Sequence, residues 1–388
     1  MSTNPTKEFP SQIVLFRASE FGQIPWPVSA EGQKARTWLE PMLEHGIEPY
    51  IRNVHTDPGV LFCDDKVVPF TVTNPFKDNS YVCSPFTHYI TYGREELEKL
   101  DSRLTKTIFG WILNQVERWF EKEEFDRVLY VNNWLLSTNL YPNLDWTRIG
   151  DIHQRLLTEF PNYPIVFRSV DQRANPELHK ALVELGYEPV FSRFVWYQDP
   201  SSPQVQKRKN YKLDRSITRK SGYKIVSGDE LEDSDFERVE ELYNQLYLEK
   251  YSKFNPQFTS EFLRYLCRAG ILNIRALRKA GRIDAVLGFY TRRGIGTAPL
   301  FGYDTSLPPK TGLYRILSWV WSEEAKEQGL LINCSAGVGQ FKKNRGAEPA
   351  LESNMVYAHH LPKARRCWGF IRFMLSRFIV PIIRKHEL

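Results

Sequence analysis

The stretch from residue 273 to residue 307 has the alternating pattern of apolar and polar residues that predicts β-strands. Segments 273–279 and 283–293 are rich in β-branched and aromatic side chains, and the Ala280–Gly281 pair between them predicts a tight turn. A second glycine turn, at 294–296, precedes a further apolar segment, TAPLFGYDTSL. We therefore expect three consecutive strands joined by tight turns.

After these strands the apolar residues recur with the period of a helix. Residues 313–329, LYRILSWVWSEEAKEQG, form one amphipathic pattern that Gly329 ends, and the short apolar segment 330–336 predicts another strand. The loop 308–315, PPKTGLYR, connects the third strand to this helix. Backbone N–H groups of such a loop and of the first helical turn point beyond the strand end, and a place of this kind binds phosphates.

This order of elements resembles the core of the GNAT acyltransferases. In that family a loop of the form Arg/Gln-x-x-Gly-x-Gly/Ala holds the pyrophosphate of an acyl-coenzyme A, and KTGLYR resembles a reduced form of it. Gly312 stands for the middle glycine, whereas Leu313 and Tyr314 follow where a second small residue is expected. The later segment FKKNRGAEPALESNMVYA ends as GNAT domains often end. The donor-binding residues that the resemblance implies are Phe301, Gly302, Lys310, Thr311, Gly312, Leu313, Tyr314 and Arg315. Lys342 and Arg345, in the basic loop of the later segment, are further candidates that could receive phosphates or the acidic surface of a carrier protein.

The first half of the chain also contains helical and strand patterns. The helices that we expect there are 34–46, 94–124, 145–160 and 176–187. Segments bounded by Asp, Pro and Asn predict short strands, which are 13–21, 60–65, 66–76, 80–93, 126–133, 163–170 and 188–198.

The ends of the two halves resemble each other. Residues 177–198 and 339–358 each contain a short helical segment, a glycine, a Glu-Pro pair and an alternating strand, which we interpret as an internal duplication. The predicted fold class is therefore α/β, with two tandem GNAT-like domains, each a mixed, mostly antiparallel sheet flanked by helices. We expect a degenerate acceptor-side domain at 1–200, an acyl-donor domain at 207–362 and a basic, apolar C-terminal helix at 363–388.

Five segments connect these domains, lie within the second of them or follow it. A polar segment rich in Pro and Ser, 199–206, predicts a linker, and the basic helix predicted at 207–224 is either a solvated surface or a contact for phosphates. Two amphipathic helices are expected at 233–251 and 255–270. The C-terminal helix mixes arginines with large apolar side chains, which fits either packing across the domains or contact with an anionic membrane surface.

Composition limits the class of protein. No apolar run is long enough to span a bilayer and the N-terminus lacks the apolar core of a signal peptide, so we expect a cytoplasmic protein that is at most peripheral to a membrane. The five cysteines are far apart and never form a C-x-x-C pair, which argues against a disulfide framework and against a metal site. Residues 1–200 contain 20 Lys and Arg against 27 Asp and Glu, whereas residues 201–388 contain 32 against 19. Such a pair of halves suits a polyanionic donor and a cationic acceptor.

Acyl transfer from a thioester to an amine needs a deprotonated amine and a polarised carbonyl. Asp304 is the first candidate for the base or for holding the acceptor ammonium, although a cap of the following turn explains it equally well. Phe341 stands where the resemblance implies a tyrosine that protonates the leaving thiolate, so that role is either empty or filled by Tyr303 or Tyr314, of which Tyr303 joins the candidate catalytic set. His88 lies among aromatic residues and completes the candidate catalytic set, with a core position as its simplest explanation.

The leading hypothesis is an N-acyltransferase. By resemblance to GNAT enzymes that acylate amino groups, including maturases of ribosomal lipopeptides, it would move an acyl group, fatty acyl above all, from acyl-coenzyme A or an acyl carrier protein. The expected acceptor is an amine of an amino acid or peptide, such as a Lys or ornithine side chain. We expect no metal and, under this hypothesis, no nucleic acid.

Two alternatives stay open. The first is a Fem-type transferase that uses aminoacyl-tRNA, which the duplication and the basic stretch favour and the lack of a long helical hairpin in the second domain opposes. The second is a non-enzymatic membrane-surface or scaffold protein with a degenerate GNAT core, which the imperfect glycine loop and Phe341 favour.

Overall fold

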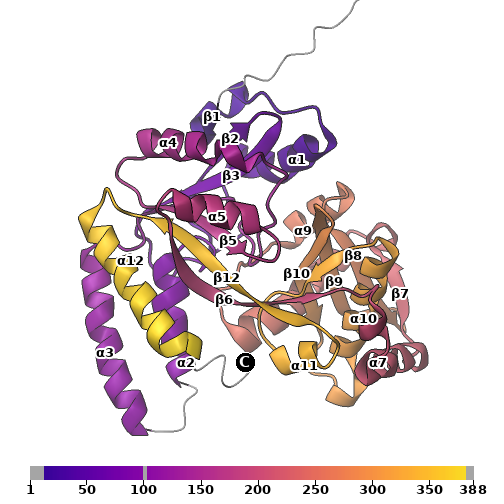
Figure 1. Cartoon of the computed structure of the whole chain (residues 1–388). Coiled ribbons are helices and arrows are strands. Elements are labelled where there is room, and N and C mark those ends of the chain that lie inside the picture. The colour runs from indigo at the N-terminus through magenta and orange to yellow at the C-terminus, as the bar shows by residue number, and fades with distance from the viewer. Residues whose placement is uncertain (1–12, 99–102, 382–388) are drawn as a thin grey trace, which may run out of the picture.

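A computed structural model describes residues 13–98 and 103–381, and within these ranges the strands form one continuous mixed sheet (Figure 1). The strand order across the sheet is β1-β2-β3-β4-β5-β12-β6-β11-β10-β9-β8-β7. The strand bounds are β1 (Val14–Arg17), β2 (Asp57–Cys63), β3 (Lys66–Thr73), β4 (Val128–Val131), β5 (Ile165–Asp171), β6 (Glu188–Gln198), β7 (Lys224–Ser227), β8 (Asn273–Lys279), β9 (Arg282–Arg292), β10 (Ile295–Tyr303), β11 (Leu331–Asn333) and β12 (Glu348–Tyr357).

Most neighbouring strands in this sheet are antiparallel. In each half one pair is parallel, β4 with β5 and β10 with β11. A parallel pair needs a crossover, and helices α4 (Ile149–Glu159) and α10 (Leu313–Glu327) provide the two crossovers. The mixed, mostly antiparallel sheet flanked by helices is the architecture that the sequence predicts.

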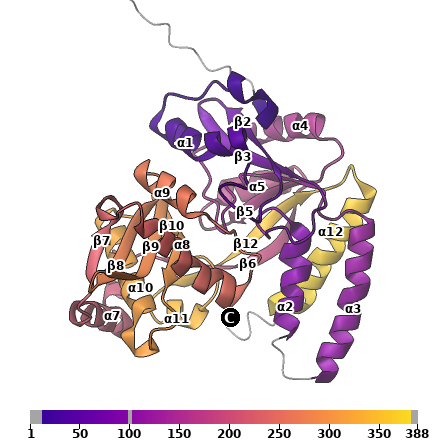
Figure 2. The ribbon, with the colours of Figure 1, turned by 180° about the vertical axis from the view of Figure 1, so that it is seen from behind.

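The two halves exchange their last strands. β12, the last strand of the chain, lies between β5 and β6 and pairs antiparallel with both, while β6 pairs with β11 of the second half. The central β6–β12 pair therefore belongs to both halves, and both views show it crossing between them (Figures 1 and 2). The domain bounds expected from the sequence, 1–200 and 207–362, stay a prediction in a sheet that is shared in this way.

Helices cover both faces of the second half of the sheet. On one face α8 (Asp235–Asn244) and α9 (Ser260–Arg268) pack with α1 (Ala30–His45) of the first half into a single apolar core. On the other face α10 packs on β9 through Ile316, Leu317 and Val320. Helix α7 (Lys209–Lys220), the predicted basic helix, packs against α10.

Three helices pack together beside the first half of the sheet, away from the second half (Figures 1 and 2). They are α2 (Tyr92–Glu98), α3 (Arg103–Lys122) and α12 (Pro362–Met374), which continues as a π-helix, Leu375–Ile379. Trp119 and Phe120 of α3 contact Phe370 of α12, with ring centroids 5.5 and 6.1 Å apart. Of the C-terminal helix predicted at 363–388, residues 363–381 are helical and α3 is their partner, while residues 382–388 lie outside the described part of the chain.

The segment 80–93, predicted as a strand, is helical instead. It contains a π-helix at Thr87–Thr91 and leads into α2. Ser84 explains the difference, because its Oγ accepts a hydrogen bond from the Thr87 N–H at 2.8 Å and so caps a helix that begins with Pro85.

Smaller differences concern three other segments. The expected linker 199–206 contains the short helix α6 (Pro203–Gln206), and the basic loop after β11 contains α11 (Gly339–Lys343). The single helix expected at 94–124 is α2 and α3, with residues 99–102 between them outside the described part of the chain.

Candidate active site

Strands β10 and β11 lie side by side over only three residue pairs. Ile295 to Thr297 align with Leu331 to Asn333, after which β10 has a register shift and pairs with β9 alone. After Thr297, the edge of β10 that faced β11 is therefore next to aromatic side chains instead of a strand. Tyr314 of α10 contacts Phe301, Tyr303 and Phe341, with ring centroids 5.1, 6.1 and 4.8 Å apart. We call this place the β10–β11 opening.

Lys342 is a buried cation beside this opening. Its side chain is on α11 and 7% exposed, and its Nζ donates to the backbone carbonyls of Ser335 and Ala336, at 3.1 and 2.7 Å. Burial, with a smaller contribution from the charge of Arg193, lowers the pKa of the ammonium to about 8. No carboxylate among the described residues pairs with it, so its charge is available to a negative group on a ligand.

Cys334 lies next to Lys342 and is partly exposed. Burial raises the pKa of its thiol to about 11, which leaves little thiolate at neutral pH. We therefore assign it no nucleophilic role.

Arg193 of β6 joins the two halves at this point. Its Nε donates to Glu352 Oε1 of β12 at 2.8 Å, and its Nη1 donates to Ser335 Oγ at 3.1 Å. Its Nη2 donates to Thr138 Oγ1 at 2.8 Å and to the Ser137 carbonyl. The guanidinium thus connects the loop after β4 with the loop that holds Lys342.

The predicted donor loop has the expected backbone but is covered by α7. Gly312 caps α10 with a left-handed backbone conformation (φ +74°). Glycine adopts this conformation with the least strain. A Cβ at Gly312 would lie 3.3 Å from Ile217 Cγ2 of α7. Lys310 is exposed and Thr311 partly exposed, whereas Leu313 is buried in the core beneath α10.

Two predicted donor-binding arginines pair with α7. Asp214 is 2% exposed and accepts from Arg315 Nε at 2.6 Å and from Arg345 Nε at 2.6 Å. These guanidiniums are engaged inside the protein. That they bind a diphosphate stays a prediction. Their ion pairs with Asp214 argue against it, because these contacts already occupy both guanidiniums.

Gly302 brings β10 close to α8. A Cβ at this position would lie 2.5 Å from the backbone carbonyl carbon of Leu242, so only glycine fits without a shift of the helix. The neighbouring Tyr303 hydroxyl accepts a hydrogen bond from Lys250 Nζ at 3.0 Å. Phe301 and Tyr303 are partly exposed at the opening, as their predicted roles require.

Asp304 is buried and paired. It is 2% exposed, its Oδ2 accepts from Arg238 Nη2 at 2.7 Å and from Arg282, and its Oδ1 accepts from the Ser306 N–H at 3.0 Å. A carboxylate held by two guanidiniums is a weak base, because the positive charges favour its ionised form. The geometry matches the turn cap that the sequence left open, and its role as the base stays a prediction.

His88 lies between Tyr81 and Tyr89, with ring centroids 5.7 and 4.4 Å away. Burial, with smaller contributions from the charges of Arg168 and Arg193, lowers the pKa of its imidazole to about 3. The ring is therefore neutral at pH 7. Its Nδ1 is buried without a hydrogen-bond partner, so it can accept a hydrogen bond from a ligand.

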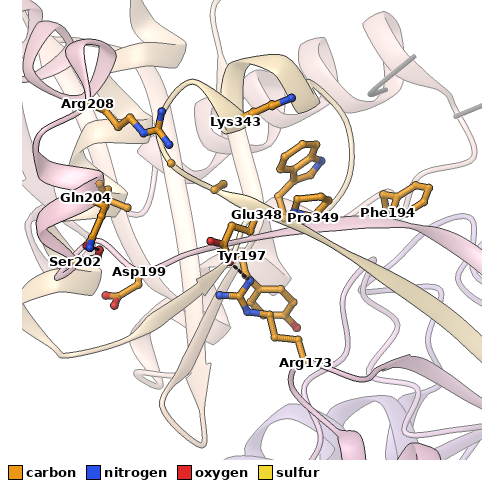
Figure 3. Close-up of a pocket in the computed structure, with 14 residues that line it drawn as sticks. Arg173, Phe194, Tyr197, Asp199, Ser202, Gln204, Arg208, Lys343, Glu348 and Pro349 are labelled. Atoms are coloured by element: carbon orange, nitrogen blue, oxygen red, sulfur yellow. Dashed lines mark hydrogen bonds and ion pairs between the residues drawn. The ribbon is translucent and has the colours of Figure 1, made fainter. Parts of the chain in front are cut away.

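A separate hollow of about 850 Å³ lies beside the β6–β12 pair (Figure 3). Aromatic side chains of β6 and cations from neighbouring segments line it, among them Phe194, Trp196, Tyr197, Arg173, Arg208 and Lys343. Arg173 pairs with Glu348 at 2.8 Å and stacks over the Tyr197 ring, 5.2 Å from its centroid.

The described residues contain no group of three or more His, Cys, Asp or Glu side chains that could hold a metal ion. Nor does any described helix combine the length and apolar content needed to cross a membrane.

Two arginines of the central strands were not among the predicted site residues. Arg168 in IVFRSVD and Arg193 in EPVFSRFVWYQ each interrupt an apolar strand pattern, and a buried cation in such a position needs a partner. That interruption was the available signal. Lys342 was named only as a phosphate-binding residue.

No protein-family model matches the chain, and no curated protein sequence matches it. Several solved structures are similar. FemX matches over 92% of this chain and 97% of its own, with a TM-score of 0.52 and 8% identity. L-PGS from Bacillus licheniformis matches over 57% of this chain and 77% of its own, with a TM-score of 0.42 and 15% identity. A GCN5-related N-acetyltransferase from Kribbella flavida matches over 60% and 82%, with a TM-score of 0.32 and 14% identity.

The α/β fold class predicted from the sequence, a mixed and mostly antiparallel sheet flanked by helices, is confirmed, and FemX shares this fold. At such identities the likeness concerns the fold alone.

Proposed function

We propose that this protein transfers an acyl group from an activated carrier to an amine, with the reaction at the β10–β11 opening. The observation that carries the proposal is the buried, unpaired ammonium of Lys342 at that opening. Acyl transfer develops negative charge on the carbonyl oxygen and then on the leaving sulfur or oxygen, and a fixed cation of this kind stabilises both.

The chemistry needs few other groups. The amine nitrogen forms a bond to the carbonyl carbon, the bond from that carbon to the carrier's sulfur or oxygen breaks, and the surplus proton on nitrogen passes to the leaving group or to water. Lys342 and Arg193 lie close enough for Arg193 to lower the pKa of Lys342. The same two cations would lower the pKa of a bound amine and favour its neutral, nucleophilic form. Asp304 and Tyr303 are, in this proposal, residues that shape the opening.

The donor that the sequence favours is acyl-coenzyme A, fatty acyl above all, or an acyl carrier protein. The GNAT-like fold and the left-handed Gly312 at the start of α10 support coenzyme A. The contacts of Arg315 and Arg345 with Asp214 oppose it, because they leave a diphosphate fewer cations. A carrier whose phosphates stay outside the opening avoids this difficulty.

A Fem-type transferase that uses aminoacyl-tRNA is the second candidate. The match to FemX over nearly the whole of both chains favours it. So does α7, whose exposed cations Lys209, Lys212, Arg215, Arg219 and Lys220 lie beside the donor loop and suit an RNA backbone. The acceptor in either case is an amine of an amino acid or peptide.

A product assay with purified protein tests the function and separates the donors. The protein is incubated with lysine or ornithine and with an acyl-coenzyme A series from acetyl to palmitoyl, an acyl carrier protein charged with palmitate, or aminoacyl-tRNA, and new amides are identified by mass spectrometry. We expect an amide with one class of donor and at least a hundredfold less with Lys342→Met, the loss typical of removing a transition-state donor. Absence of product with every donor, or full activity of Lys342→Met, would contradict the proposal and leave the non-enzymatic alternative.

A further inference from the structure

The strand β5 carries a buried arginine without a carboxylate. Arg168 is 3% exposed, and its Nη1 donates to Asn133 Oδ1 at 2.7 Å and to the Leu136 carbonyl at 3.3 Å. Among the residues that the structure describes, its Nε and Nη2 have no hydrogen-bond partner, and neither atom is sealed from solvent. Tyr130 lies under the guanidinium, 5.4 Å from ring centroid to Cζ. Burying a cation whose N–H groups lack acceptors costs free energy unless a ligand accepts their hydrogen bonds.

The carboxylates near Arg168 are already engaged. Glu352 pairs with Arg193, and Asp171 accepts from the Tyr197 hydroxyl at 2.9 Å and from two backbone N–H groups. Asp126 accepts from Ser84 Oγ and from the Phe86 N–H, both at 2.8 Å, and burial raises its pKa to about 6. None of these groups neutralises Arg168.

Arg168 is connected to the β10–β11 opening through two loops. Arg168 and Arg193 donate to the consecutive carbonyls of Leu136 and Ser137. Arg193 in turn donates to Ser335 Oγ, and Lys342 donates to the Ser335 carbonyl. Three cations thus follow one another from β5 to the opening, and only Arg193 has a carboxylate partner.

The groups around Arg168 can hold a ligand. Tyr81 and His88 are partly exposed, and their ring centroids lie 5.7 Å apart. Asn133, which accepts from Arg168, donates through its Nδ2 to the carbonyl of Val82, the residue after Tyr81, at 3.0 Å. The unpartnered His88 Nδ1 accepts a hydrogen bond, and the Tyr81 hydroxyl donates one. An anionic group with a neighbouring donor, such as a carboxylate next to an amide N–H, matches this set.

We propose that Arg168, together with His88 and Tyr81, forms a subsite for a carboxylate or phosphate group of the amine acceptor. The acceptor is thus an amine that also carries an anion, with its anion at Arg168 and its amine toward Lys342. This inference rests on the proposed function for the identity of the ligand as acceptor. It differs from the cationic acceptor suggested by the acidic first half of the sequence, because Arg168 in that half is a buried cation without a carboxylate partner among the described residues.

Ligand binding to this subsite can be measured without any transfer reaction. The thermal midpoint of the full chain is followed against N-acetylglycine, which has a carboxylate and no amine, against inorganic phosphate, and against the neutral N-acetylglycinamide. A ligand that binds only the folded state raises the midpoint with the logarithm of its concentration. We expect a rise with one of the two anions, which identifies the anion, and none with the amide.

The variant Arg168→Gln should bind that anion about 10- to 100-fold more weakly, as expected for the loss of a charged hydrogen-bond pair. Arg168→Lys should retain part of the binding, and Arg365→Gln, which removes an exposed arginine of α12, should bind as the unaltered protein does. Gln keeps a donor for Leu136 and removes an unpaired charge, so we expect Arg168→Gln to fold. An equal response to the amide, or undiminished anion binding by Arg168→Gln, would overturn the subsite.

The proposed function and the subsite can fail separately. Arg168-dependent anion binding without transfer to any amine would remove the function and leave the subsite. Equal transfer to glycine and to glycinamide would remove the acceptor role of the subsite and leave the function.

Discussion

Asp214 of α7 and Arg345, two residues after α11, form a buried bidentate ion pair. Arg345 Nε lies 2.6 Å from Asp214 Oδ2, and its Nη2 lies 3.1 Å from Oδ1. Arg315 of α10 donates to the same carboxylate, and its Nη2 is buried without a partner. One carboxylate therefore holds two guanidiniums and ties α7 to the helix and turn that border the β10–β11 opening.

We predict that Asp214→Asn destabilises the fold by about 3–5 kcal/mol, because it leaves two buried guanidiniums without a negative partner. Urea unfolding followed by circular dichroism measures the change. Asp233→Asn is the matched control. Asp233 pairs with Arg264 and Arg268 at the surface, where its side chain is 62% exposed, and its loss should change the free energy of unfolding little. Equal effects of the two substitutions would show that the buried cluster contributes no more than a surface pair.

Much of the fold follows from local pattern. The strands β8, β9 and β10 and the helix α10 could be placed because their side-chain periods and glycine turns are encoded within each segment. The segment 80–93 was misplaced because the capping hydrogen bond of Ser84 outweighed the strand preference of its aromatic residues. The exchange of β6 and β12 could not be deduced, since the repeated Glu-Pro strands show that two segments are alike but not which neighbours they choose.

The candidate site was less accessible to sequence reasoning. Phe301, Tyr303 and Tyr314 lie together at the opening because adjacent elements carry them, which local order predicts. The pairing of Arg315 and Arg345 with Asp214 depends on how α7 packs, and a basic helix gives no sign of a single buried carboxylate. The chain of contacts from Arg168 to Lys342 links four segments that are distant in sequence.

Lys342 makes the proposed reaction depend on pH in a specific way. Its pKa of about 8 means that half of the ammonium has lost its proton at pH 8, so the stabilising cation disappears above that pH. We predict that, above pH 8, kcat/KM of the unaltered protein falls relative to kcat/KM of Lys342→Arg, because the guanidinium of the variant stays charged. The ratio of the two activities is measured from pH 6 to pH 10. Because both proteins act on the same acceptor amine, the effect of protonating that amine cancels in the ratio. Lys326→Met, on the exposed side of α10, should follow the unaltered protein at every pH. A ratio that does not change with pH would remove Lys342 from the mechanism as a cation.

His88 should make stability depend on pH. Its pKa is about 3 in the folded protein, below the ordinary value of 6.5, so between these values the unfolded chain binds a proton that the folded chain does not. Stability from this residue is therefore complete above pH 6.5 and is lost as the pH falls toward 3, by about 1.4 kcal/mol per pH unit. Asp126 acts in the opposite direction, because its raised pKa favours the folded state at low pH.

We predict that the difference in unfolding free energy between the unaltered protein and His88→Gln shrinks by about 2 kcal/mol from pH 7 to pH 5. Comparing the two proteins at each pH cancels the contribution of Asp126, which both contain. Urea unfolding at the two pH values gives the difference. A constant difference would mean that folded His88 takes up a proton as readily as an unfolded one.

The paired helices α3 and α12 expose large apolar side chains toward one end. Trp111 and Ile112 of α3 are 65% and 36% exposed, and Phe373, Phe378 and Ile379 at the end of α12 are 59%, 48% and 41% exposed. Trp111 and Phe378 each lie eight residues, about 12 Å of helix, from the contact of Trp119 with Phe370, in the same direction because the helices are antiparallel (Figure 1). Arg377, next to Phe378, is exposed and has no ion-pair partner among the described residues.

This combination supports the membrane contact that the sequence suggested for 363–388 and adds α3 to it. We predict that the protein floats with vesicles of phosphatidylcholine and anionic phosphatidylglycerol, and much less with phosphatidylcholine alone. Aromatic side chains enter the interface, and each arginine near an anionic surface contributes about 1 kcal/mol. Raising the salt concentration should weaken the binding, because it screens that attraction. The double variant Trp111→Ser, Phe378→Ser should lose binding, whereas Val28→Ser, which alters a 92% exposed residue elsewhere, should retain it. Flotation that is the same for both vesicle types, or that survives the double substitution, would assign the exposed end to another partner.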